Sequence, residues 1–226
     1  MPVHYEKQYS SNKYNFFHLL NDSYYTTDLH CHDFIEIYLT ISGGKFFLLN
    51  DTFYSMEKGD LFVVNSLDIH RVIRQEDICY ERYVLEYKPL FVQPFCTAQA
   101  DLMHYVRSKT GSNAAKLSLP PETLEHLLEM FKKYESLDEN SFGYDLKKQI
   151  CFLEILAYIA EIFLEDPTPE DNYPKNINPL VSSLLTYIGE NITADLRLDN
   201  LASQVNVDKH YLCHLFKKCT GITINN

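Results

Sequence analysis

The sequence predicts an α+β fold with an antiparallel β-barrel in its first half, then a helical pair, then a small all-α unit. Three observations predict it. Between Tyr38 and Tyr87, short β-rich runs alternate with turn residues. After Pro120, apolar residues recur at helical spacing. Four prolines within residues 165–179 then separate the helical pair from a last helical block. A chain of 226 residues is long enough for more than one domain.

Residues 1–119 are predicted to form an N-terminal arm, over residues 1–29, and then the barrel. Turn residues at 42–44, 50–51 and 58–60 separate the candidate strands. The strand runs include FFLLN, LFVVN and YERYVLEY. Short strands joined by small turns are typical of a closed barrel or a sandwich, since both arrangements protect strand edges.

Residues 120–166 are predicted to form a helical pair that dimerises. The second helix, from Tyr144 to Glu165, carries two apolar stripes. One stripe contains Phe152, Leu156, Ile159 and Phe163, and the other contains Leu146, Ile150, Leu153, Ala157, Ala160 and Leu164. Because one small barrel can cover only one stripe, the other requires a second helix or subunit. We therefore expect a homodimer through the 144–165 helix.

The charge distribution leaves a nucleic-acid partner open despite a net charge of -11. Residues 1–176 contain 16 Lys+Arg against 27 Asp+Glu, whereas residues 177–226 contain 4 of each. The acidic excess thus lies upstream of the last helical block, and acidity disfavours phosphate contacts only there. Residues 167–176 are expected to be a linker and residues 177–226 a separate C-terminal unit.

Cysteine usage and hydropathy predict a cytoplasmic protein that does not enter a membrane. The six cysteines form no CxxC pair, which suits reduced thiols. No run of eighteen apolar residues occurs, and the N-terminal residues lack the apolar core of a signal peptide.

A group of histidines and one glutamate marks the candidate ligand site. His30, His32 and Glu36 stand near the first strands, and ten residues separate Gly59 from His70. This spacing resembles the cupin signature, although Asn65 and Leu67 replace the proline and glycine usual in its second motif. Such residues can converge inside a barrel as three imidazoles and a carboxylate.

We expect these residues to contact a small polar effector, such as a sugar, without a metal or other cofactor. The candidate ligand-binding residues are His30, His32, Glu36, His70, Tyr38 and Tyr83. The alternative is a cupin metalloenzyme, such as a dioxygenase or isomerase, that uses His30, His32, Glu36 and His70. The sequence contains neither a nucleophile beside a base nor a Gly-rich phosphate loop, and either would favour catalysis. No enzymatic activity is therefore expected.

The C-terminal block has the spacing of a helix-turn-helix. Leu198, Leu201 and Ala202 begin a short amphipathic helix, Asn206 suits a left-handed turn, and Asp208 can cap the next helix. The segment LDNLASQVNVDKHYLCHLFKKCTGI resembles the first helix-turn-helix of the AraC/XylS family of transcription regulators. In that family a second helix-turn-helix follows, and this sequence does not contain it, so the resemblance implies that residues 177–226 form a partial DNA-binding domain.

The resemblance implies a ligand-responsive regulator whose second helix enters the DNA major groove at an operator half-site. The residues that it places toward DNA are Lys209, His210, Cys213, His214, Lys217 and Lys218. Lys217 and Lys218 are expected to meet phosphates rather than bases. With one such unit of neutral charge balance, we expect weak DNA binding by this chain.

Overall fold

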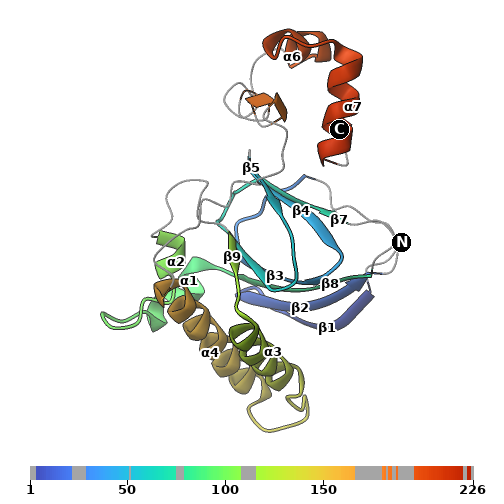
Figure 1. Ribbon diagram of the computed structural model, residues 1–226. Helices are drawn as coiled ribbons and strands as arrows, with labels where there is room; N and C mark the ends of the chain where they lie inside the picture. The colour runs from blue at the N-terminus through green and yellow to red at the C-terminus, as the bar shows by residue number, and fades with distance from the viewer. Residues whose placement is uncertain are drawn as a thin grey trace.

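The computed structural model describes residues 4–21, 29–50, 52–74, 79–107, 116–165 and 196–220, together with residues 180, 181, 183, 184, 187, 223 and 224. The expected linker, residues 167–176, lies outside the described residues. Nine strands form two sheets in the described ranges, and a helical pair follows them in the chain (Figure 1). Over these ranges, no helix combines the length and apolar character that crossing a membrane requires.

The strands are β1 (His4–Ser10), β2 (Tyr14–Asn21), β3 (Ile35–Ser42), β4 (Gly44–Leu49), β5 (Thr52–Ser55), β6 (Asp60–Val64), β7 (His70–Arg74), β8 (Tyr80–Tyr87) and β9 (Lys116–Ser118). The helices are α1 (Pro89–Val92), the 3-10 helix η1 (Gln93–Phe95), α2 (His104–Arg107), α3 (Pro121–Glu135), α4 (Tyr144–Glu165), α6 (Leu198–Gln204) and α7 (Lys209–Thr220).

Two antiparallel sheets face each other and enclose the first apolar core (Figure 1). The larger sheet has the strand order β1-β2-β8-β3-β6-β9, and the smaller has the order β5-β4-β7. Side chains from both sheets meet between them, including Tyr38, Phe47, Phe62 and Val84. This packing confirms the antiparallel β-structure that the short runs and turns predicted.

The larger sheet is buried on both faces. Successive side chains of a strand point to opposite faces, so Tyr38 and Val84 lie between the sheets while Ile37 and Leu85 belong to a second core. That second core is covered by α3 and α4 (Figure 1). The two-sided burial explains why β3 and β8 carry large apolar residues on both of their faces.

The N-terminal segment differs from the expected arm. Residues 4–10 and 14–21 form a hairpin that extends the larger sheet, with β2 paired along its whole length to β8. Tyr14 and Phe16 are buried in the core beneath the helices and stack on Phe91 and Tyr134. Aromatic burial therefore fixes a segment whose weak periodicity had suggested no strand.

Helix α4 has the predicted bounds, and its two stripes have different environments. Phe152, Leu156, Ile159 and Phe163 are buried, as one covered stripe requires. On the other stripe, Leu146, Ile150 and Leu164 are each more than half exposed. Ala160, which the sequence analysis grouped with this second stripe, is instead buried.

A buried lysine ties the start of α4 to the end of α3. Lys148 is 5% exposed, and its Nζ donates a hydrogen bond of 2.7 Å to the carbonyl oxygen of Tyr134. The ammonium also lies 3.9 Å from the centroid of the Tyr134 ring. A carbonyl at a helix C-terminus and an aromatic face both stabilise a cation, so these contacts accommodate the buried lysine.

Candidate functional site

The predicted histidine–glutamate group comes together at one end of the space between the sheets. His30 and His70 form an isolated antiparallel bridge, with His70 N donating to His30 O at 2.9 Å and His30 N to His70 O at 3.2 Å. Their ring centroids are 4.2 Å apart. Glu36, on β3, faces them: its Oε2 lies 2.8 Å from His32 Nε2 and 3.4 Å from His70 Nε2.

The turn between β6 and β7 holds these histidines in place. The Leu67 amide donates a 2.8 Å hydrogen bond to the carbonyl of His32. The Asp68 side chain accepts from the Asn65 amide at 3.0 Å, and the Asp68 carbonyl oxygen lies 3.0 Å from Nδ1 of His70. Leu67 adopts φ of 70°, a left-handed conformation that favours glycine. The turn thus keeps the glycine-like geometry of the resembled motif although the residue differs.

Within the cluster, Glu36 and His70 are buried, His32 is half-buried and His30 is exposed. Burial by itself would raise the pKa of Glu36, but contacts from His32 and His70 outweigh it and lower the pKa to about 2. The contact with Glu36 raises the pKa of His32 above its ordinary value. Burial opposes the charged form of His70, yet Glu36 raises its pKa as well. Glu36 is therefore an anion that faces two imidazoles.

A second carboxylate, missed by the sequence analysis, lies beside the first. Glu86 on β8 is paired in register with Glu36 on β3. Asn15 of β2 donates to Glu86 Oε2 at 2.7 Å. Burial, the largest effect, raises the pKa of Glu86, and the charge of Glu36 adds to it. The alternation in YERYVLEY places Glu86 on the inner face, but its approach to Glu36 depends on strand register.

The two predicted tyrosines lie on opposite faces of the larger sheet. Tyr38 follows Glu36 by two residues and is buried between the sheets, where its hydroxyl has no hydrogen-bond partner among the described residues. Tyr83 lies in the core under the helices, with its ring 4.6 Å from that of Phe131. The inclusion of Tyr83 in the ligand site is corrected here, because strand alternation points it away from the cluster.

The cluster also has the donor types of a cation site. Over the described residues, ligand atoms of His30, His32 and His70 lie within 4.8 Å of one another, and so do those of His32, Glu36 and Glu86. His32 Nδ1 is buried without a hydrogen-bond partner among the residues that the structure describes. Imidazole nitrogens with a carboxylate suit divalent transition metals. The residues present therefore fit such an ion.

The C-terminal helices pack through a small core of their own. Leu201 and Ala202 of α6 are buried with Leu212 and Phe216 of α7. The turn between the helices contains Asn206 with φ of 53°. Asp208 Oδ1 accepts hydrogen bonds from the amides of His210, at 2.8 Å, and Tyr211, at 3.3 Å. This is N-capping geometry, and the pKa of Asp208 is lowered by those amides.

The six residues expected to face DNA have unequal surroundings. His210, His214 and Lys217 are exposed on α7, whereas Cys213 is half-buried. Lys209 is exposed but forms an ion pair with Asp199 of α6, with Nζ 2.9 Å from Oδ1. Lys218 lies on α7, and its side chain falls outside the described part of the structure. Tyr211, 54% exposed on the same helix, was not among the expected residues.

Comparison with known protein families gives one match over more than half of the chain. The model described as the AraC-like ligand binding domain matches residues 16–156. This range runs from β2 into α4, and it includes the histidine–glutamate cluster.

Curated relatives include the HTH-type transcriptional activator RhaR of Escherichia coli O139:H28 and of Shigella boydii serotype 4. Each is 24% identical over 203 residues, which is 87% of this chain and 67% of the relative. Among solved structures, apo ToxT K231A from Vibrio cholerae is similar over 95% of this chain and 78% of that chain, at 11% identity and a TM-score of 0.48. The plu4264 protein from Photorhabdus luminescens is similar over 37% and 70%, at 19% identity and a TM-score of 0.33.

Proposed function

Since the chain belongs to the AraC-like ligand binding domain family, we propose that it is a cytoplasmic, ligand-responsive regulator of transcription. Its barrel binds a small polar effector, and its C-terminal helices bind an operator half-site in DNA. The observation that carries the proposal is the histidine–glutamate cluster, with Glu36 and His70 buried, within the matched residues 16–156. The RhaR relatives, which are transcriptional activators by name, support the regulatory role.

The effector site that we propose contains His30, His32, Glu36, His70 and Tyr38, with Glu86 added. The Tyr38 hydroxyl and Nδ1 of His32 are buried groups whose hydrogen-bonding capacity is unused within the described ranges. A ligand rich in hydroxyl groups, such as a sugar, would supply both donors and acceptors to them. Selectivity for polar ligands follows, because a purely apolar ligand would leave these groups unsatisfied.

Effector binding is tested by titrating the full chain with a panel of neutral monosaccharides and following heat release and melting temperature. We expect saturable binding by at least one member. Glu36→Gln should weaken it about tenfold or more, because a charged hydrogen-bond acceptor is lost. The matched control is His126→Gln, since His126 is exposed on α3. Equal affinity of the Glu36 variant and the parent chain would contradict the proposed site.

For DNA, the proposal assigns α7 to the major groove. His210, His214 and Lys217 project from one helical face, as residues three, four and seven apart do. Asp208 caps this helix and fixes where it begins. The coupling to the effector requires that ligand and DNA favour the same conformational population, because a ligand shifts an equilibrium only by its differential affinity.

A metal-dependent cupin enzyme is the second candidate, and the convergent donors favour it. His30, His32 and His70 would hold a divalent cation, with Glu36 beside them; a bound cation would polarise a substrate oxygen as a Lewis acid. Elemental analysis of protein purified without chelators separates the candidates. One stoichiometric metal whose removal abolishes turnover would favour the enzyme. Sub-stoichiometric metal with retained effector binding would favour the regulator.

A further inference from the structure

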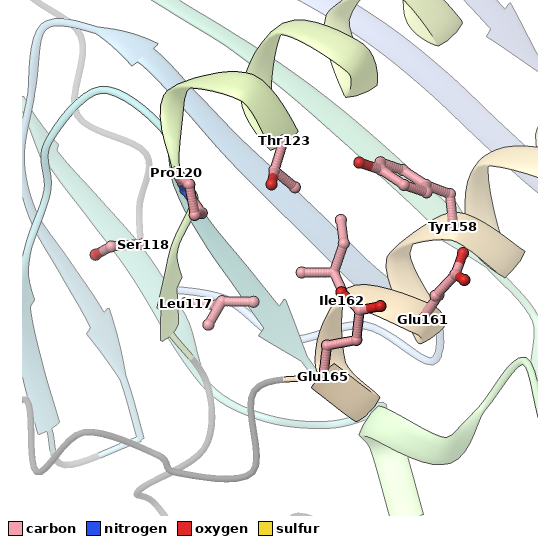
Figure 2. A pocket seen from close by; sticks show the side chains of 8 residues that line it. All are labelled: Leu117, Ser118, Pro120, Thr123, Tyr158, Glu161, Ile162 and Glu165. Atoms are coloured by element: carbon pink, nitrogen blue, oxygen red, sulfur yellow. The ribbon is translucent and has the colours of Figure 1, made fainter.

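A cleft of about 450 Å³ lies where β9, the start of α3 and the last turns of α4 meet (Figure 2). Its volume falls within the range of small-molecule sites. It is lined by Leu117, Ser118, Pro120, Thr123, Tyr158, Glu161, Ile162 and Glu165. None of these residues belongs to the histidine–glutamate cluster, so the cleft is a separate feature of the domain.

The lining combines an apolar floor with oxygen atoms. Leu117 and Ile162 approach from opposite sides (Figure 2), while Thr123 and Tyr158 bring hydroxyl groups. Ser118 is already engaged, because its Oγ donates to Asp60 Oδ1 at 2.6 Å. In the described part of the chain, no lysine, arginine or histidine lines the cleft. An apolar body would fit the floor, and an anionic group would meet no cation.

Two carboxylates give the cleft its charge. Glu161 and Glu165 are one helical turn apart and both are exposed; in Figure 2 the Glu161 carboxylate lies below Tyr158 and that of Glu165 beside Ile162. Like charges at this spacing repel, and the C-terminal end of a helix disfavours anions. The last turn of α4 contains no basic residue to offset them. Both carboxylates therefore carry negative charge that the helix itself does not stabilise.

Two lysines of the described ranges, one on β9 and one on α3, pair with other carboxylates. Lys116, next to Leu117, has its Nζ 2.8 Å from Asp60 Oδ2. Lys133 on α3 has its Nζ 2.9 Å from Glu154 Oε2, about two helical turns before Glu161. Within the described ranges, neither Glu161 nor Glu165 forms an ion pair. A cation supplied from outside would relieve the repulsion.

We propose that this cleft binds an amphiphilic organic cation, a primary amine or guanidine with an apolar body. The cationic head lies between the carboxylates of Glu161 and Glu165, and the body packs on Leu117 and Ile162. Charge-assisted hydrogen bonds to carboxylates are the strongest contacts available there. Apolar burial of the body adds to them. The site is separate from the barrel cluster, and it borders the exposed stripe of α4, since Leu164 of that stripe directly precedes Glu165.

The test uses the full chain and three probes of equal length: hexylamine, hexanol and hexanoate. Binding is measured by calorimetry and by NMR shifts of the Ile162 methyl groups. We expect saturable binding of hexylamine and at least about tenfold weaker binding of hexanol and hexanoate. Replacing both Glu161→Gln and Glu165→Gln should reduce hexylamine affinity about tenfold or more and make it insensitive to salt. The proposal is overturned if hexanoate binds as well as hexylamine, or if the double variant retains full affinity.

Two controls separate this site from other features of the protein. Glu154→Gln removes an exposed carboxylate of the same helix outside the cleft and should leave hexylamine affinity unchanged. Glu36→Gln, in the histidine–glutamate cluster, should also leave it unchanged. Equal weakening by Glu154→Gln would mean that the helix attracts amines by its general charge, and this result also overturns the proposal.

Discussion

At the scale of single residues, the cost of a left-handed backbone conformation depends on which residue adopts it. Leu67 and Asn206 both have positive φ, of 70° and 53°. Asparagine tolerates this region because its short polar side chain can bond locally, whereas leucine is strained there. Leu67 is also 69% exposed, so its side chain gains little from burial.

We predict that Leu67→Gly stabilises the protein. The left-handed conformation costs a leucine about 1–2 kcal/mol, and glycine avoids this cost. Glycine's greater freedom in the unfolded chain offsets roughly 0.5–1 kcal/mol of the gain. The net gain should be about 0.5–1 kcal/mol in the free energy of unfolding, measured by urea denaturation. Asn206→Gly, the matched change, should be close to neutral. A loss of stability in the Leu67 variant would show that its side chain makes a contact that outweighs strain.

At the scale of elements, one histidine joins the end of α3 to the sheet. On β2, Nε2 of His18 is 2.9 Å from Oε1 of Glu81 on β8. Its Nδ1 is 3.0 Å from Oε1 of Glu135 on α3. Its ring stacks on Tyr83 at 4.1 Å. Burial would lower the pKa of His18, but the two carboxylates outweigh it and raise the pKa above its ordinary value. Only the doubly protonated ring carries the positive charge that attracts both carboxylates.

This arrangement predicts a pH dependence with a definite sign. Because the folded-state pKa of His18 is raised, its contribution is fully present below about 6.5, the ordinary histidine pKa, and is lost as the pH rises through the folded-state value. The stability difference between the parent chain and His18→Gln should therefore shrink from about pH 6 to about pH 9. Thermal unfolding across that range measures it. His126→Gln serves as the control, and a difference that stays constant with pH would contradict the prediction.

Element boundaries were predictable where periodicity was strong and long. The run YERYVLEY and the span from Tyr144 to Glu165 match β8 and α4, because each pattern extends over a whole element. The β1–β2 hairpin was not predictable in this way. Its residues are rich in tyrosine and asparagine, and its place depends on pairing with β8, which is distant in the chain.

The site was predictable in part for a related reason. Spacing alone grouped His30, His32, Glu36 and His70, and the structure brings these four together. Glu86 could not be joined to them without knowing the register between β3 and β8. Tyr83 was assigned to the wrong face, since tyrosines in a strand buried on both sides look alike in sequence.

At the scale of the whole molecule, the exposed stripe of α4 predicts assembly. Ile150 and Leu164 are 56% and 57% exposed, and Leu153 is half-buried against the core. We expect a homodimer through this stripe, because an apolar surface of this kind is costly on a monomer. Ile150→Glu combined with Leu164→Glu should yield monomers in sedimentation, while Leu90→Glu, at another exposed leucine, should not. A parent chain that sediments as a monomer at micromolar concentration would contradict this expectation.

DNA binding by this chain should be weak, and its lysines should contribute unequally. Lys217 is exposed on α7, so Lys217→Ala should weaken binding to all DNA sequences and lower the salt slope by about 1. Lys209→Ala should have a smaller effect, because Asp199 already neutralises Lys209. Mobility assays at several salt concentrations measure both slopes. Nanomolar specific binding at physiological salt would refute the expected weakness.

The shared wall formed by β3 and β8 also restricts how related sequences can vary in length. Inserting or deleting one residue within either strand would exchange its faces. A change in β3 would turn Glu36 toward α3 and α4 and Ile37 toward the space between the sheets, and a change in β8 would do the same to Glu86 and Leu85. Both cores would be damaged by a single event. Insertions and deletions in homologous chains should therefore accumulate at the ends of these two strands and be rare inside them.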